Sequence, residues 1–128
     1  MAAGGLMAKS AASSIHGRVL SSKCPSRQIL RHLTSRWGEL VLMVLGGGTR
    51  RFSEIRREIE GVSDRMLSQA LADLEADGMV SRKAYNTIPP KVEYSLTEFG
   101  KEAYSRLQPL VGWLEENLGS ILASRRAV

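Results

Sequence analysis

The amino-acid sequence predicts an α+β domain that is mainly α, and three observations lead to this prediction. Apolar residues recur every three or four positions along most of the chain after residue 23, a spacing typical of amphipathic helices. Between residues 80 and 96 the period changes to two, which indicates a two-stranded hairpin. The helical period then returns after residue 97. We therefore expect short helices, one hairpin and a long C-terminal helical region.

Residues 1–22 are rich in Ala, Ser and Gly and carry no periodic apolar face, so we expect a flexible tail. The same segment lacks acidic residues, which is also typical of an organelle transit peptide. A basic arm that follows DNA phosphates is a third interpretation. We expect residues 23–124 to form one domain.

The charge of the chain favours an acidic partner. The formal net charge is +5 over 128 residues and the sequence pI is near 9.8. Residues 1–38 contain six basic residues and no acidic one, whereas the rest of the chain contains twelve basic and thirteen acidic residues. A DNA-binding surface in the domain would therefore depend on local clusters of basic side chains. No apolar run approaches the length of a membrane span, so we expect no membrane partner.

Two helices are expected at the start of the domain. Pro25 suits a first helical turn, because the N–H that proline lacks would be unpaired there anyway. Apolar residues follow it at helical spacing, namely Ile29, Leu30 and Leu33. The second helix ends at the glycines of residues 46–48, and its predicted core stripe is Trp37, Leu40, Val41, Val44 and Leu45.

Two further short helices are separated by Gly61. Ser53 is expected to cap the first of them, with Ile55 and Ile59 facing the core. Ser63 is expected to cap the second, which ends at Gly78. The predicted buried stripe of this helix is Leu67, Ala70, Leu71 and Leu74. Its outward face is Asp64, Arg65, Ser68, Gln69, Ala72 and Asp73. The N-terminal half of such a helix can reach base edges in a DNA major groove.

The hairpin is predicted from strands at residues 80–85 and 91–96. Pro89 and Pro90 cannot donate to a strand ladder, so we place them in the connecting tip, residues 86–90. Three basic residues are expected near this tip with only Glu93 opposing them, namely Arg82, Lys83 and Lys91. This charge pattern suits contact with phosphates or with the adjacent minor groove.

A C-terminal helical region is expected to begin at Thr97, its cap, and to be kinked or divided by Pro109. Its long apolar stripe includes Leu107, Leu110, Trp113, Leu114, Leu118 and Ile121. One small domain cannot easily cover so long a stripe, so we expect these helices to pack against a second copy of the chain.

The sequence shows no clear pattern for a disulfide, a metal site, a phosphate loop or a catalytic triad. Cys24 is the only cysteine, which excludes an intrachain disulfide and favours a reducing compartment. His16 and His32 lie far apart and form no recognisable metal site with it. The glycines of residues 46–48 are not followed by the Lys-Ser/Thr pair of a phosphate loop, and no catalytic triad spacing is evident. We expect no enzyme, no metal and no cofactor.

Residues 24–118 resemble the HxlR-type winged helix-turn-helix regulators, which are relatives of the MarR group. The matching pieces are Cys24-Pro25, Arg36-Trp37, RFSEIRR, MLSQALADLEADGMV and the ending PPKVEYSLTEFG. The resemblance implies a homodimeric, cytoplasmic transcription factor that binds a palindromic operator in double-stranded DNA. It would use the helix of residues 63–77 and the wing of residues 80–96. Many relatives tend to carry Arg near Ala70 and Ala72, which are alanines here.

The expected DNA contacts are of two types. Ser68 and Gln69 can read donor and acceptor patterns in the major groove, and Arg65 can take a guanine or hold a phosphate. Sequence-independent affinity would come from Arg51, Arg82, Lys83 and Lys91, and the complete set of expected DNA-binding residues also includes Ser63. The alternative function is a winged-helix module for protein association that binds no DNA.

Some HxlR-type members sense quinones, aldehydes or oxidants through an N-terminal cysteine at a similar place. The resemblance therefore makes Cys24 a candidate sensor, and the helix that follows it, with Lys23 and Arg27, is expected to lower its pKa. A thiol that only packs at the dimer edge is the alternative interpretation. A small-molecule effector, or none, also stays open.

Overall fold

The computed structural model describes residues 14–127, which fall into two units with their boundary between Arg31 and His32. Helix α2 (Pro25–Leu33) contains this boundary, and Pro25 lies at its start as predicted. Most of the predicted tail, residues 1–13, lies outside the described residues. No helix within residues 14–127 is long and apolar enough to cross a membrane.

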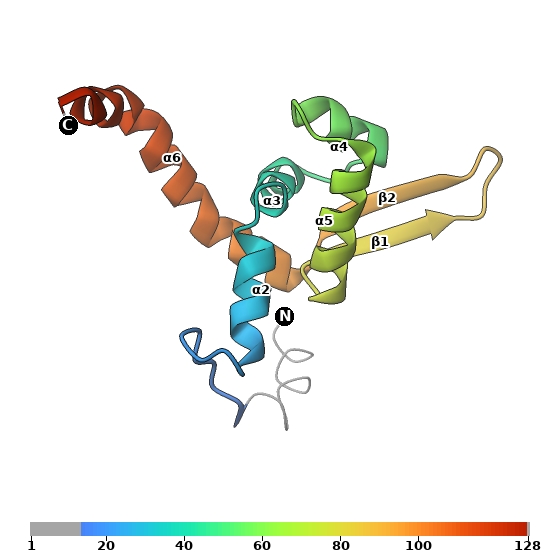
Figure 1. Cartoon of the computed structure of the whole chain (residues 1–128). Helices are drawn as coiled ribbons and strands as arrows, with labels where there is room; N and C mark the ends of the chain where they lie inside the picture. The colour runs from blue at the N-terminus through green and yellow to red at the C-terminus, as the bar shows by residue number, and fades with distance from the viewer. Residues whose placement is uncertain (1–13, 128) are drawn as a thin grey trace. The chain divides into compact units, whose positions relative to one another are not determined.

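The second unit has the predicted order of elements (Figure 1). Three helices come first: α3 (Gly38–Gly46), α4 (Phe52–Glu58) and α5 (Asp64–Ala76). Strands β1 (Val80–Tyr85) and β2 (Lys91–Leu96) then form an antiparallel hairpin, followed by the long helix α6 (Glu98–Ala127). The predicted α+β, mainly helical class is confirmed.

The core of this unit forms where α3 meets α4, α5, α6 and the base of the hairpin. Its fully buried side chains include Val41, Leu42, Ile55, Leu67 and Leu74. The predicted stripe of α3 was partly wrong, because Leu40 is 38% exposed whereas Leu42 is 1% exposed. Elements pack around α3 on several sides, so its buried surface is wider than a single amphipathic stripe.

The start of α4 also differs from the prediction. Arg51, and not Ser53, is the residue that precedes the helix. The Glu54 carboxylate accepts a hydrogen bond from the Arg51 backbone N–H at 2.7 Å, which satisfies a donor at this helix end. Ser53 therefore lies within the first turn and is exposed.

The hairpin joins the helices near its base. Arg50 pairs with Tyr94 of β2 by two backbone hydrogen bonds of 3.0 and 2.8 Å, which adds a short third segment to the ladder. Directly after β2, Thr97 caps α6 as predicted, since its hydroxyl accepts the Gly100 N–H at 3.0 Å and donates to the Gly78 carbonyl. The turn after α5 and the start of α6 are thus held together.

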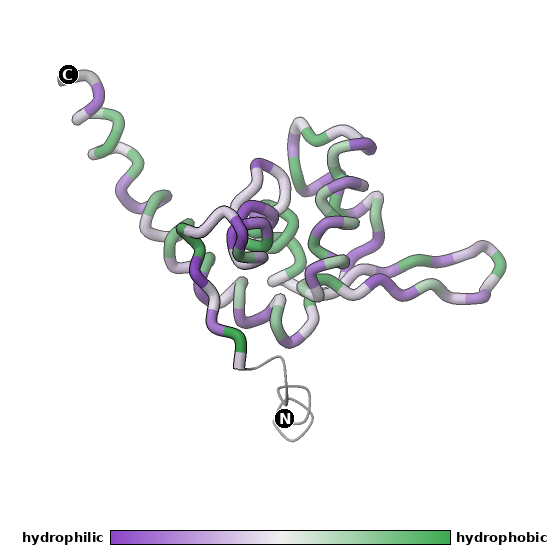
Figure 2. The backbone as a smooth tube through the Cα atoms, turned by 60° about the horizontal axis from the view of Figure 1, so that its bottom comes forward, coloured by the Kyte–Doolittle hydropathy of each residue, from purple (hydrophilic) through white to green (hydrophobic). Residues whose placement is uncertain are grey.

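Helix α6 is continuous through Pro109, so the prediction that this proline divides the helix was wrong. The proline removes one backbone donor, but intact hydrogen-bonded turns on both sides carry the helix past it. Apolar residues recur along the length of α6, alternating with polar ones (Figure 2). Beyond its contact with α3, several large apolar side chains stay exposed, namely Leu110, Trp113, Leu114, Leu118 and Leu122.

Candidate nucleic-acid interface

Helix α5 separates a buried face from an exposed face as the sequence predicted. The Ser63 hydroxyl accepts the Met66 backbone N–H at 3.1 Å and caps the helix. The predicted inner stripe is buried in full, namely Leu67, Ala70, Leu71 and Leu74. The opposite face is exposed over its first half, at Asp64, Arg65, Ser68 and Gln69, and again at Ala72. This half of the helix carries the side chains that a DNA groove could meet.

The side chains on the exposed face differ in their partners. Within residues 14–127 no hydrogen bond or ion pair engages the side chains of Arg65 and Ser68. Asp64 forms an ion pair with Arg56 of α4, which neutralises a carboxylate that would otherwise repel phosphates. Gln69 donates from Nε2 to Asp73 Oδ1 at 2.9 Å. Arg65 and Ser68 are therefore available for an external partner, and Gln69 is already oriented.

The hairpin carries a polar cluster that we call the Tyr85 cluster, formed by Lys83, Tyr85, Lys91 and Glu93. The Nζ atoms of Lys83 and Lys91 lie 5.0 and 4.7 Å from the centre of the Tyr85 ring, within the range of cation–π contacts. Lys91 Nζ also lies 3.4 Å from Glu93 Oε2. The Tyr85 hydroxyl donates to Glu93 at 2.9 Å, and this bond, followed by the nearby Lys91 ammonium, lowers the pKa of the Glu93 carboxyl. The positive charge of Arg51 contributes further to the same shift.

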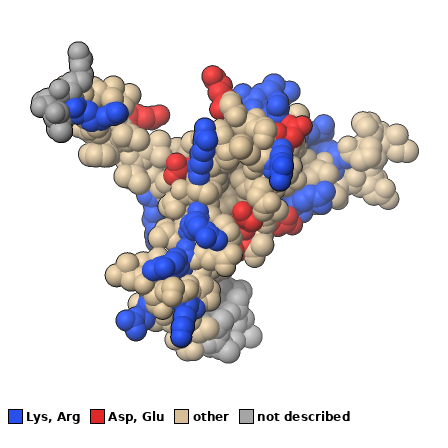
Figure 3. Space-filling model, viewed as in Figure 1, with Lys and Arg blue, Asp and Glu red and all other residues tan. Residues whose placement is uncertain are grey.

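Arg82 does not belong to the Tyr85 cluster. It pairs with Tyr94 in the ladder, one position away from the Lys83 pair with Glu93, and neighbouring residues of a strand point to opposite faces. The three expected cations of the wing are therefore divided between two faces. The tip itself carries no charge, and Figure 3 shows the Lys and Arg atoms set back from the uncharged end of the hairpin. The alternation of side chains along a strand, which can be counted in the sequence, already predicts that Arg82 lies on the face opposite Lys83.

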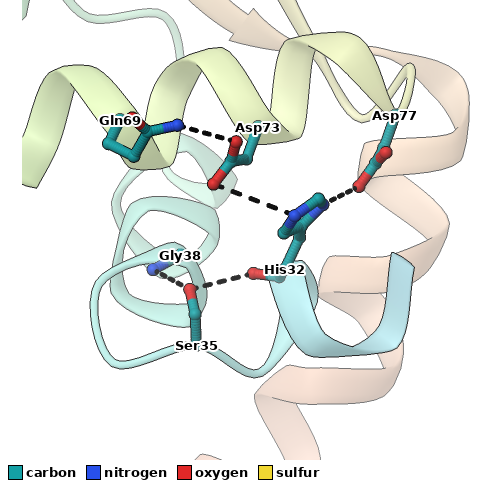
Figure 4. A network of polar contacts seen from close by, with 6 residues as sticks. All are labelled: His32, Ser35, Gly38, Gln69, Asp73 and Asp77. Carbon is teal, nitrogen blue, oxygen red and sulfur yellow. Dashed lines mark hydrogen bonds and ion pairs between the residues drawn. The ribbon is translucent and has the colours of Figure 1, made fainter. Parts of the chain in front are cut away.

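A side-chain network beside α5 was not predicted. His32, at the end of α2, is half-buried, with Nδ1 2.6 Å from Asp77 Oδ2 and Nε2 3.9 Å from Asp73 Oδ2 (Figure 4). Asp73 in turn holds Gln69. The sequence indicated a half-buried or surface histidine, but it carried no signal for these partners, which lie 41 and 45 positions along the chain.

Cys24 lies in the first unit, immediately before α2. Its sulfur accepts hydrogen bonds from the Arg18 backbone N–H at 3.3 Å and from the Ser26 hydroxyl at 3.0 Å. These bonds, with Arg18 the larger cause, lower the pKa of the Cys24 thiol. A lowered pKa was expected, but the sequence assigned it to the helix, Lys23 and Arg27.

Comparison with known proteins agrees with this geometry. Residues 32–121 match the family model described as HxlR-like helix-turn-helix. The HTH-type transcriptional regulator YtfH of Escherichia coli (strain K12) is 50% identical over 109 residues, which cover 85% of this chain and 86% of that protein.

Two solved structures are also similar. The transcriptional regulator ytfH from Salmonella typhimurium has 47% sequence identity and a TM-score of 0.82, over 87% of this chain and 99% of that chain. The redox regulator HypR in its oxidized form has 39% identity and a TM-score of 0.68, over 73% of this chain and 97% of that chain.

The helices α3 to α5, the hairpin and these similarities define a winged helix-turn-helix transcriptional regulator and not an enzyme. The chain belongs to the HxlR-like helix-turn-helix family. The resemblance noted in the sequence is thereby confirmed.

Proposed function

We propose that the protein acts in the cytoplasm as a homodimer that binds a palindromic operator. Helix α5 of each copy would enter a major groove, and each hairpin would contact phosphates or the adjacent minor groove. The observation that carries this proposal is the exposed first half of α5, where Arg65 and Ser68 have no partner within residues 14–127. Two-fold symmetry would place the two helices about 34 Å apart, one turn of DNA.

Each proposed contact has a chemical role. Gln69 keeps its carbonyl oxygen and one N–H beside the bond to Asp73, and adenine offers the complementary donor and acceptor in the major groove. Arg65 would take a guanine or a phosphate, and Ser68 would read a single polar group. Ser63 would bring the positive end of α5 toward a phosphate. The remaining phosphate contacts would come from Arg51, Arg82, Lys83 and Lys91.

Alanine substitutions separate base reading from phosphate binding. In fluorescence anisotropy with a duplex covering the region upstream of the protein's own gene, Arg65→Ala and Gln69→Ala should each lower affinity about 5- to 100-fold. Both should also reduce the preference over a scrambled duplex. Arg82→Ala should instead reduce the slope of log K against log salt by about one and leave the preference intact.

Arg106→Ala serves as the control, because it removes the same charge from an exposed side chain of α6. This variant should bind as the unmodified protein does. Binding to the duplex that depends on neither salt concentration nor DNA sequence would contradict the proposal. It would favour the alternative function, a module for protein association.

The proposed dimer interface lies on α6. Its exposed apolar side chains include Leu110, Trp113, Leu114 and Leu118, a set that a second copy could bury. Ile121 is half-buried, and Leu107 packs partly against the core of its own chain. We therefore propose that the part of the helix beyond Leu107 supplies most of the interface.

We further propose that Cys24 responds to oxidants or electrophiles. The lowered pKa of its thiol supports this role, because the thiolate is the reactive form, and the structurally similar HypR is a redox regulator. With one cysteine per chain, a protein disulfide would join Cys24 of two copies. Two thiols would lose two protons and two electrons, and diamide would take them up to become a hydrazine.

Treatment with diamide tests this role. The treatment should change the affinity of the unmodified protein for the upstream duplex and leave that of Cys24→Ser unchanged. An equal response in both proteins would rule out Cys24 as the switch.

Alkylation rates test the cause of the reactivity. Iodoacetamide should modify Cys24 faster at neutral pH than it modifies an ordinary thiol of pKa about 8.5. Ser26→Ala should slow this reaction, because removing the hydroxyl donor raises the pKa of the thiol.

A further inference from the structure

We propose that His32 is a positioning residue for base reading, which acts on Gln69 through Asp73. The inference rests on the proposed role of Gln69 and adds a residue that lies outside the exposed face of α5. Figure 4 shows His32 between the carboxylates of Asp73 and Asp77, with Gln69 beyond Asp73.

The imidazole of His32 is held between two carboxylates. A carboxylate only accepts, so the Nδ1–H of His32 donates to Asp77 at 2.6 Å, while Nε2 faces Asp73 at 3.9 Å. The side chains of His32 and Asp77 are 16% and 15% exposed, so this contact is largely shielded from solvent. Asp73, a residue of α5, is 34% exposed and lies between the shielded His32–Asp77 pair and the exposed Gln69. At 3.9 Å the ring is a close neighbour of the Asp73 carboxylate and not its hydrogen-bond partner, so it restricts that carboxylate by occupying the space beside it.

Asp73 in turn selects one orientation of the Gln69 amide. Its Oδ1 atom accepts from Gln69 Nε2 at 2.9 Å, so the amide nitrogen must point toward Asp73 and the carbonyl oxygen away from it. An exposed glutamine otherwise loses rotamer freedom when it binds, and an orientation held in advance reduces that loss. Of the two possible orientations of the Gln69 amide, Asp73 thus maintains the one in which Oε1 points away from Asp73.

The backbone of His32 is itself fixed. The Ser35 hydroxyl donates to the His32 carbonyl at 3.1 Å and accepts the Gly38 N–H at 2.9 Å. A Cβ at Gly38 would collide with that same carbonyl, so the turn from α2 to α3 is tightly packed. Contacts thus lead from a rigid turn through His32 and Asp73 to Gln69.

A double-mutant cycle on the whole protein tests the inference, with the upstream duplex as the probe. His32→Ala should lower affinity about fivefold, within the range expected when one side chain must be ordered on binding, without changing the salt slope. In a Gln69→Ala background the same change should have no further effect, because its route to the DNA is already removed. Asp73→Ala should show the same dependence on Gln69.

Glu75→Ala is the matched control for Asp73→Ala, since it removes one exposed carboxylate from the same helix. It should leave the preference for the upstream duplex over a scrambled duplex unchanged. Thermal unfolding of each variant shows that it is folded at the temperature of the binding measurement.

Comparing the loss of affinity for His32→Ala with and without Gln69 separates failure of this inference from failure of the proposed function. An equal loss of affinity for His32→Ala in both backgrounds would overturn the inference, because His32 would then act independently of Gln69. If Gln69→Ala alone changed neither affinity nor sequence preference, the proposed reading role of Gln69 would fail, and the inference would fall with it. A loss confined to the background that retains Gln69 supports the inference.

Discussion

Replacing both Leu114 and Leu118 by aspartate is expected to convert the protein into a monomer and to lower its affinity for a palindromic duplex at least about a hundredfold. These side chains are 46% and 48% exposed on α6, and burying a carboxylate in an apolar interface is strongly unfavourable. A dimer gains from binding its second half-site intramolecularly, and a monomer loses that gain, which is worth about 10²- to 10⁴-fold. Sedimentation equilibrium would measure the assembly and anisotropy the affinity.

The matched control is Ser120→Asp, which adds a carboxylate to an exposed position of the same helix. This variant should stay dimeric and bind DNA normally. If the double leucine variant sedimented as a dimer, the proposed interface on α6 would be wrong. A monomeric variant that kept full affinity would instead separate dimerisation from operator binding.

Replacing Gly100 by alanine is expected to destabilise the fold by about 3 kcal/mol, within the upper range for overpacked sites. Gly100 is buried in the first turn of α6, where a Cβ would collide with the Met79 carbonyl oxygen. That carbonyl accepts the Thr97 N–H at 3.0 Å, so it cannot move away without breaking the joint between the hairpin and α6. Unfolding in urea would measure the change.

Gly119→Ala is the control for this substitution, because a Cβ there meets no atom within 4 Å. Alanine in the helix interior should stabilise the protein by up to about 1 kcal/mol. Both variants need the same protein concentration, since the stability of the proposed dimer would depend on it. An unchanged stability for Gly100→Ala would contradict the tight joint between Met79 and α6.

Several parts of the structure followed from local sequence patterns. The buried stripe of α5 and its Ser63 cap were predicted correctly, because helical spacing and capping involve residues at most a few positions apart. The strands of the hairpin were also predicted, since alternation and the prolines of the tip are local signals. The candidate residues Arg65, Ser68 and Gln69 lie on the exposed face of α5, as helical spacing predicts.

The errors had different physical causes. Leu40 and Leu42 both belong to an apolar run, and only the neighbours of α3 decide which is buried. Ser53 was a reasonable cap, but Glu54 satisfies the backbone at Arg51 and the helix begins earlier. Pro109 suggested a break, yet α6 continues past it.

By itself, the sequence determined the order of the elements, the inward and outward faces of α5 and the family to which the chain belongs. Only the tertiary structure decided that His32 lies against Asp73 and Asp77, and that Gly100 lies against Met79. The physical reason is that periodicity and capping act within a few residues. The partner of a half-buried polar group, or the atom that a glycine must avoid, depends on how distant segments pack.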